Sequence, residues 1–147
     1  MKTLFIFVLC LAPVAHAQTV APTVAEFHKK ANGQFQVRNN TVTPLVVVIS
    51  MSEFHRENGQ QITTPLSSNI HVELNEMSAR LAPLSTHTFS YKATCDSLPC
   101  GFAFYSRFSG AHVSEGVGVA LWVPSSVCIC ADSVKGCHER VRALLDK

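Results

Sequence analysis

A run of alternating side chains near the C-terminal end constrains the fold more than any other part of the sequence. The run is Gly116–Pro124, and Trp122 lies on the face opposite its larger apolar residues. Alternation with a period of two predicts a β-strand, and a proline, which lacks a backbone N–H, predicts the end of that strand at Pro124. The larger apolar residues that share one face are Val117, Val119, Leu121 and Val123.

The first 17 residues predict a secretory signal peptide. Lys2 precedes an apolar run over Leu4–Leu11, and Ala15-His-Ala17 matches a small-residue cleavage site before Gln18. The apolar run is too short to cross a bilayer as a helix, and an uncleaved anchor is the alternative to cleavage. No other stretch is long and apolar enough to be a transmembrane helix, so we expect no membrane span after cleavage. The mature chain is therefore expected to be periplasmic or secreted.

Several shorter runs with β-strand character precede the Gly116–Pro124 run. Phe35 and Val37 alternate with polar residues, and Leu45–Met51 is rich in β-branched side chains. Strands are predicted over residues 24–28, 33–38, 45–51, 69–74, 86–91 and 101–108, with a hairpin or loop over 53–64 and a connection over 77–83. About seven short strands with no helix among them predict an all-β, immunoglobulin-like β-sandwich.

The C-terminal segment predicts one short amphipathic helix. Val134, Cys137 and Val141 recur at helical spacing, and Asp132 or Ser133 can cap a helix that begins near Asp132. We therefore expect three parts in the chain. They are a signal peptide over residues 1–17, the sandwich over 18–130, and a helix over 131–147 that packs on the sandwich.

Composition and motifs argue against several classes of function. The formal net charge is only +2, and no basic cluster indicates a nucleic-acid partner. The sequence contains no phosphate-binding loop, dinucleotide fingerprint, hydrolase elbow or His-Glu-x-x-His motif. We therefore expect a protein that is not an enzyme and that has neither a cofactor nor a small-molecule substrate.

Loss of Cys10 with the signal peptide leaves an odd number of cysteines. Exported proteins usually form disulfides. Because five cysteines remain, at least one thiol stays unpaired or bonds to another chain. Cys95 and Cys100 bracket a short loop and can form a local disulfide, whereas either Cys128 or Cys130 could bond to Cys137 and staple the helix. The disulfide candidates are Cys95, Cys100, Cys128, Cys130 and Cys137.

The same region offers an alternative hypothesis of a metal-binding or thiol-redox exported protein. Four soft or borderline ligands lie within residues 128–138, and zinc or copper(I) can use such ligands. Their spacing, Cys-x-Cys followed by Cys-His, matches no common zinc motif. The ligands of this alternative would be Cys128, Cys130, Cys137 and His138. A structural envelope domain without a ligand is a third possibility.

Three groups of residues, spread over roughly residues 22–127, resemble the first domain of the periplasmic pilus-assembly chaperones, the PapD-like family. They are Val37–Thr41 with Pro44–Val48, Leu81–Ser85 with Phe89, and Val117–Pro124. The resemblance implies a protein that binds another exported protein or pilus-type subunit by β-strand addition. It also implies that the row formed by Val117, Val119, Leu121 and Val123 enters the partner. The same row could instead fill the core of this domain.

The sequence departs from the family pattern in two respects. Only residues 131–147 follow the sandwich, where the family has a second sandwich. The family anchors a terminal carboxylate with a basic pair, but no Lys or Arg occurs between Ser109 and Ala131. Lys29 or Lys30 lies near the first position of that pair, and neither can be assigned to it. We therefore expect a single-domain relative of these chaperones.

Overall fold

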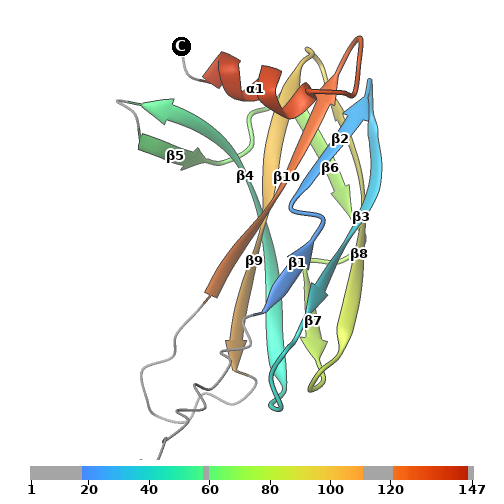
Figure 1. The fold of residues 1–147 in the computed structure, drawn as a ribbon, viewed down its shortest axis with the longest axis vertical. Coiled ribbons are helices and arrows are strands. Elements are labelled where there is room, and N and C mark those ends of the chain that lie inside the picture. The colour runs from blue at the N-terminus through green and yellow to red at the C-terminus, as the bar shows by residue number, and fades with distance from the viewer. Residues whose placement is uncertain (1–17, 58–59, 111–120, 146–147) are drawn as a thin grey trace, which may run out of the picture.

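The computed structural model describes residues 18–57, 60–110 and 121–145, and in these ranges two β-sheets face each other while a short helix lies across one end (Figure 1). The elements are β1 (Thr19–Ala21), β2 (Val24–His28), β3 (Ala31–Arg38), β4 (Leu45–Glu57), β5 (Gln60–Thr64), β6 (Ile70–Leu74), β7 (Ser78–Leu81), β8 (Thr86–Cys95), β9 (Cys100–Gly110), β10 (Leu121–Cys130) and α1 (Cys137–Leu145). No helix among these residues is long and apolar enough to cross a membrane.

The strands form one sheet with the order β1-β3-β8-β6 and a second with the order β2-β10-β9-β4-β5, in which β7 also pairs with β4. We call them sheet A and sheet B. Neighbouring strands are antiparallel, except that β2 runs parallel to β10. This architecture confirms the predicted all-β, immunoglobulin-like sandwich with a short C-terminal helix.

Aromatic side chains from both sheets fill the core. Phe35 stacks on Phe89 with ring centroids 5.2 Å apart and on Phe104 at 4.8 Å. Tyr91 meets Phe104 at 4.8 Å, and all four of these rings are buried. Such pairs add to the stabilisation that comes from removing large apolar surfaces from water. The alternation predicted around Phe35 is confirmed, because its side chain and that of Val37 point inward.

Two connections differ from the sequence prediction or refine it. The polar segment after Met51 forms a hairpin, since β4 continues to Glu57 and pairs with β5. The predicted connection over 77–83 was wrong in part, because β7 pairs with the start of β4. Leu81, at the end of β7, is 1% exposed, and Ala79 packs partly buried against the main core. Two inward side chains therefore hold this short segment in the sheet.

Two of the segments on which the family resemblance rests, around residues 37–48 and 81–85, meet in space around Asn39. Its side chain is fully buried, and Nδ2 donates to the carbonyl oxygens of Thr43 (2.8 Å) and Ala82 (3.0 Å). Asn39 Oδ1 accepts the backbone N–H of Thr41 at 2.9 Å, and the Asn39 N–H donates to Ser85 O at 2.9 Å. A buried amide with this set of partners ties the turn before β4 to the turn after β7.

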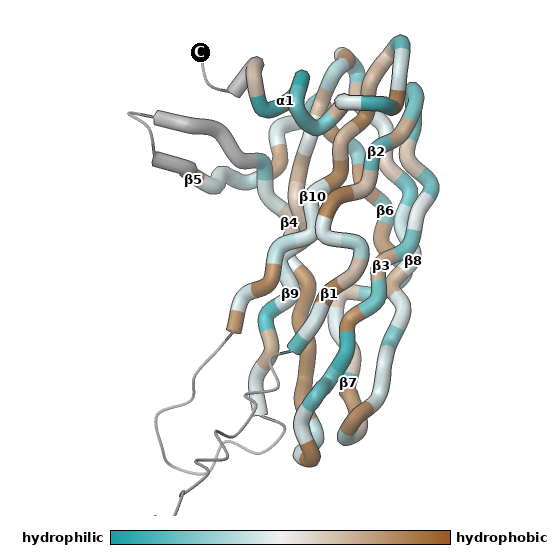
Figure 2. Tube along the Cα trace, viewed as in Figure 1, coloured by the Kyte–Doolittle hydropathy of each residue, from teal (hydrophilic) through white to brown (hydrophobic). Residues whose placement is uncertain are grey.

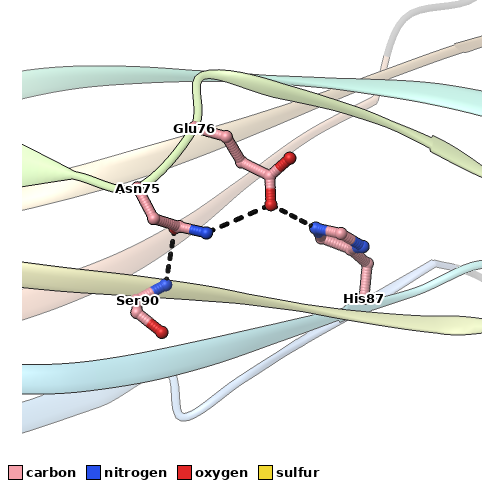
Figure 3. Close-up of polar contacts among 4 residues, drawn as sticks. All are labelled: Asn75, Glu76, His87 and Ser90. Carbon is pink, nitrogen blue, oxygen red and sulfur yellow. Dashed lines mark hydrogen bonds and ion pairs between the residues drawn. The ribbon is translucent and has the colours of Figure 1, made fainter.

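A polar network holds the corner between β6 and β7 on β8 (Figure 3). Asn75 Oδ1 accepts the Ser90 N–H at 2.8 Å, and Asn75 Nδ2 donates to Glu76 Oε1 at 3.1 Å. His87 Nε2 donates to the same carboxylate oxygen at 2.6 Å. The turn between β6 and β7 is therefore tied to β8 by the side chains of Asn75, Glu76 and His87.

The predicted start of the helix near Asp132 was wrong. Gly136 has a φ of +72°, a left-handed conformation that a right-handed helix does not contain, and α1 begins at the next residue. Glu26 of β2 accepts the His138 backbone N–H at 2.6 Å, so a carboxylate from the sandwich caps the first turn in place of Asp132 or Ser133.

Candidate partner-binding edge on strand β10

Strand β10 passes through Pro124 and continues to Cys130, so the predicted strand end was wrong. The Ser126 N–H donates to Thr23 O at 2.8 Å, on the side away from β9. Because backbone N–H groups alternate sides along a strand and the β9–β10 register has no break, the nitrogens of Trp122 and Pro124 face that same side. The missing N–H of Pro124 therefore costs the β9 ladder nothing, which explains why the strand tolerates it.

The two halves of β10 differ in how they are paired. Residues 126–130 lie between β9 and β2, with Ser126 opposite Val24 and Cys130 opposite His28. Residues 121–125 pair with β9 on one side, and no described strand pairs with their other side. We call this unpaired side of residues 121–125 the open edge. It presents the N–H and C=O of Trp122 and the C=O of Pro124.

The end of the open edge is set by the chain crossing from β1 in sheet A to β2 in sheet B. The Ser125 hydroxyl donates to Pro22 O at 2.6 Å, at this crossing. From Ser126 onward, β2 occupies the edge. A strand that adds to the open edge must therefore stop or turn near Ser125.

The predicted binding row falls into three parts. Val117 and Val119 lie outside the described residues. Val123 is half-buried and packs against the main core, whereas Leu121 is 38% exposed. Trp122, on the opposite face of the strand, is 53% exposed. In Figure 2 the start of β10 alternates between brown and pale colours, as an alternating strand does. The open edge thus combines unpaired backbone with the exposed side chains of Leu121 and Trp122.

The outer face of sheet B carries a groove of about 440 Å³ beside Trp122. Its lining residues come from β4, β5, β9 and β10 and are Ser50, Ser52, Thr63, Tyr105 and Trp122. Arg107, directly opposite Trp122 in the β9 ladder, places its guanidinium carbon 5.7 Å from the centroid of the indole ring. This cation–π contact fixes the ring beside the open edge.

Strand β6, at the edge of sheet A, makes a useful contrast. It carries His71 and Glu73, and His71 Nε2 lies 3.2 Å from Asp96 Oδ1. Charged side chains on an edge strand discourage pairing with another chain. Residues 121–125 contain no ionisable side chain, so the open edge of β10 lacks this protection.

The structure places the candidate lysines at the wrong end of β10 for a basic pair at the open edge. The Lys29 N–H donates to Cys130 O at 2.9 Å, and nine residues of extended strand, about 30 Å, separate Cys130 from Leu121. Arg107, in contrast, is a cation that lies beside the open edge, over Trp122. Sequence reasoning missed Arg107 because only the cross-strand register places it opposite Trp122.

The five cysteines after the predicted signal peptide form two disulfides and one unpaired thiol. Cys95 is bonded to Cys100 with Cα atoms 6.5 Å apart, and Cys130 is bonded to Cys137 at 5.9 Å. Cys128 is unpaired and buried. Burial, with the Glu26 carboxylate as a second cause, raises the pKa of the Cys128 thiol to about 12.

The Cys130–Cys137 bond argues against the alternative hypothesis of a metal site at residues 128–138. Cys130 and Cys137 are bonded to each other, so the four predicted ligands are not available together. Within the part of the chain that the structure describes, no group of three or more His, Cys, Asp or Glu side chains is placed to hold a metal ion. The Cys128–His138 region acts instead as the attachment point of α1.

No family model and no curated protein sequence matches this chain. Solved structures are similar to it. The structure of the Salmonella enterica SafA pilin in complex with the SafB chaperone has a TM-score of 0.60 at 14% identity, covering 85% of this chain and 59% of that one. The E. coli chaperone DraB has a TM-score of 0.59 at 14% identity, covering 82% and 58%.

The Caenorhabditis elegans protein SSP-19, an MSP-domain protein-like family member, has a TM-score of 0.53 at 11% identity and is covered over 99% of its length. The chain thus spans a little over half the length of the chaperone chains and nearly all of SSP-19. Likeness at such low identity establishes the fold and nothing finer. The described domain is an immunoglobulin-like β-sandwich of the PapD-like type.

Proposed function

We propose that this protein is an exported, chaperone-like binding module that pairs an extended segment of another exported protein with the open edge of β10. The observation that carries the proposal is the division of β10. Residues 126–130 are paired on both sides, whereas residues 121–125 are paired on one side only and carry the exposed side chains of Leu121 and Trp122.

Strand addition suits the chemistry of this edge. Trp122 offers one donor and one acceptor, and Pro124 offers a second acceptor. Each backbone hydrogen bond formed there adds about 0.5–1.5 kcal/mol. Side chains of the incoming strand would alternate between Leu121 on the inner face and Trp122 on the outer face. An apolar, extended segment that ends or turns near Ser125 is therefore the partner that fits best.

Two further observations support the proposal. The sequence begins with a predicted signal peptide and the structure contains two disulfides, both of which favour an exported protein. One similar structure is a chaperone in complex with a pilin. At 14% identity it contributes the fold, so the partner of this chain has to be identified by experiment.

Site-specific photo-crosslinking in the native host tests the proposal. A photoreactive residue replaces Leu121 on the open edge, and in a matched control it replaces the exposed Glu73 on β6, an edge strand of sheet A. We expect Leu121 to crosslink to one defined segment of an exported protein and Glu73 not to do so. Equal labelling from both positions, or no crosslink from Leu121, would contradict strand addition at β10.

A synthetic peptide of the crosslinked segment then provides a direct measurement. Trp122 is the only tryptophan in the sequence, so its fluorescence reports on this edge alone. We expect saturable quenching or a spectral shift on titration, together with slower hydrogen exchange of the Trp122 amide. A peptide that binds without protecting this amide would place the contact elsewhere on the domain.

A further inference from the structure

Three cysteines share one buried cluster that the proposed binding edge does not use. Cys128, Cys130 and Cys137 are at most 2% exposed and, together with Val141, form a cluster distinct from the main core. Cys130 and Cys137 are bonded to each other, and Cys128 keeps a thiol. An unpaired sulfur therefore lies in the same small cluster as a disulfide.

The cluster is separated from the other disulfide by sheet B. Cys95 and Cys100 pack against the main core, inside the sandwich. Cys128 lies between Val127 and Ile129, whose side chains point into that core, so its own side chain points to the outer face. The disulfide that Cys128 can approach is therefore the Cys130–Cys137 bond.

Helix α1 covers all three sulfurs. A Cβ atom at Gly101 would lie 2.7 Å from Val141 Cγ1 and 3.7 Å from Cys128 Sγ, so the helix rests on bare backbone directly beside this thiol. Cys128 and Cys130 are two residues apart on one face of β10, about 6.6 Å along the strand. Cys137 faces this pair from the first turn of the helix.

We propose that Cys128 is a second partner for Cys137, so that the covalent clamp on α1 can rearrange from Cys130–Cys137 to Cys128–Cys137. The Cys128 thiol loses its proton to solvent, and the thiolate attacks Cys137 Sγ. The Cys130–Cys137 bond breaks, and the departing Cys130 thiolate takes up a proton. One disulfide and one thiol remain, so no outside oxidant or reductant is needed.

The surroundings of Cys128 keep the pairing seen in the structure at neutral pH. From β2, residue Glu26 lies opposite Cys128 and its carboxylate acts on the thiol. The group from α1 that contacts this carboxylate is the backbone N–H of His138, at 2.6 Å. β9 contributes the uncharged Gly101. Because these surroundings raise the pKa of Cys128 to about 12, little thiolate exists at pH 7 and the exchange is slow.

The variant Cys130→Ser tests the proposal, with Cys128→Ser as its matched control. Each oxidised, full-length protein is quenched in acid and mapped by mass spectrometry of non-reduced peptides. We expect Cys130→Ser to contain the Cys128–Cys137 bond and Cys128→Ser to keep the Cys130–Cys137 bond. Reduced Cys128 and Cys137 in an oxidised, folded Cys130→Ser protein, or a bond from Cys128 to Cys95 or Cys100, would overturn the proposal.

A second experiment needs no variant and decides the matter if Cys130→Ser fails to fold. The wild-type protein is incubated at pH 7 and at pH 9, quenched at intervals and mapped in the same way. Below the pKa of the attacking thiol the thiolate fraction rises tenfold per pH unit, so we expect the Cys128–Cys137 bond to form about 100-fold faster at pH 9. Absence of this bond at pH 9, or a rate that does not depend on pH, refutes the rearrangement.

Discussion

Both halves of β10 pair with β9 on one side, but only the second half pairs with a strand, β2, on its other side. Residues 126–130 are covered by β2 at the edge and by α1 on the outer face, and the side chains of residues 127–130 are at most 2% exposed. Residues 121–125 share β9 but leave a backbone edge open, with Leu121 and Trp122 exposed. The second half of β10 is thus part of the core, whereas the first half carries the surface to which we assign binding in the proposed function.

This contrast predicts that substitutions in the two halves act on different measurable quantities. Changes in residues 126–130, which we call the closed half, should alter the free energy of unfolding. Changes in the open half should leave folding nearly intact and alter binding. The largest expected difference comes from two truncations of comparable size.

Ile129→Ala should destabilise the protein by about 2–5 kcal/mol, because Ile129 is fully buried and its loss leaves a cavity. Leu121→Ala should cost about 1 kcal/mol or less, because Leu121 is 38% exposed. Urea titrations of both variants and the wild type give the two values. Similar losses for both variants would mean that the open half is as much a part of the core as the closed half.

Removal of the Cys130–Cys137 disulfide should cause the next largest loss in the free energy of unfolding. The double variant Cys130→Ser with Cys137→Ser should lose about 2–3 kcal/mol, since a short covalent loop no longer restricts the unfolded chain. Hydrogen exchange should become faster over residues 126–130 and α1, and should stay unchanged at Trp122. Cys95→Ser with Cys100→Ser is the control, because it removes a loop of similar length without freeing the helix. Faster exchange at Trp122 in the first double variant would show that the two halves are coupled.

The alternating pattern of the sequence predicted the parts of the fold that depend on one strand and one face. Phe35 and Val37 point inward as their spacing requires, and the last strand exists where Val123 and its neighbours alternate. The errors arose where tertiary pairing decides the outcome. Pro124 ends a strand only if its missing N–H faces a ladder, and here it faces the open side.

The remaining errors have the same origin. Glu26 caps the helix from another strand, and the left-handed Gly136 moves the helix start to Cys137, neither of which helical spacing alone reveals. The open edge itself depends on the point at which the chain crosses from β1 to β2. The hydrogen bond from Ser125 to Pro22 that marks this point joins residues far apart in the sequence.

Alkaline pH should weaken the closed half through Cys128. Its pKa is raised from 9.0 to about 12 in the folded protein, so the folded state holds this proton more tightly than the unfolded state. The resulting stability is fully present below pH 9 and is lost as the pH rises from 9 toward 12, by about 1.4 kcal/mol per unit. To prevent disulfide exchange with Cys128, both proteins carry Cys130→Ser with Cys137→Ser. Between pH 8 and pH 10 in urea titrations, the protein that keeps Cys128 should lose about 1.4 kcal/mol more of its free energy of unfolding than the protein with Cys128→Ala. An equal loss in both proteins would contradict this assignment.

The smallest expected change in stability separates the backbone of the open edge from its side chain. Trp122→Ala and Trp122→Pro both remove the indole, but only the proline removes the N–H. Because this N–H faces away from β9, both variants should unfold within about 1 kcal/mol of the wild type. Val123→Pro is the matched control, since the Val123 N–H faces β9 and its loss removes a ladder bond.

The affinity for the partner peptide should differ between Trp122→Ala and Trp122→Pro, although their free energies of unfolding are similar. Against the peptide identified by crosslinking, Trp122→Pro should bind about 3- to 10-fold more weakly than Trp122→Ala, which corresponds to one backbone hydrogen bond. Calorimetry gives both affinities without relying on the lost fluorescence of Trp122. If the two variants bind equally, the partner contacts the side chains of this half of β10 and not its backbone. The open edge would then be a surface patch, and strand addition would not be its mechanism.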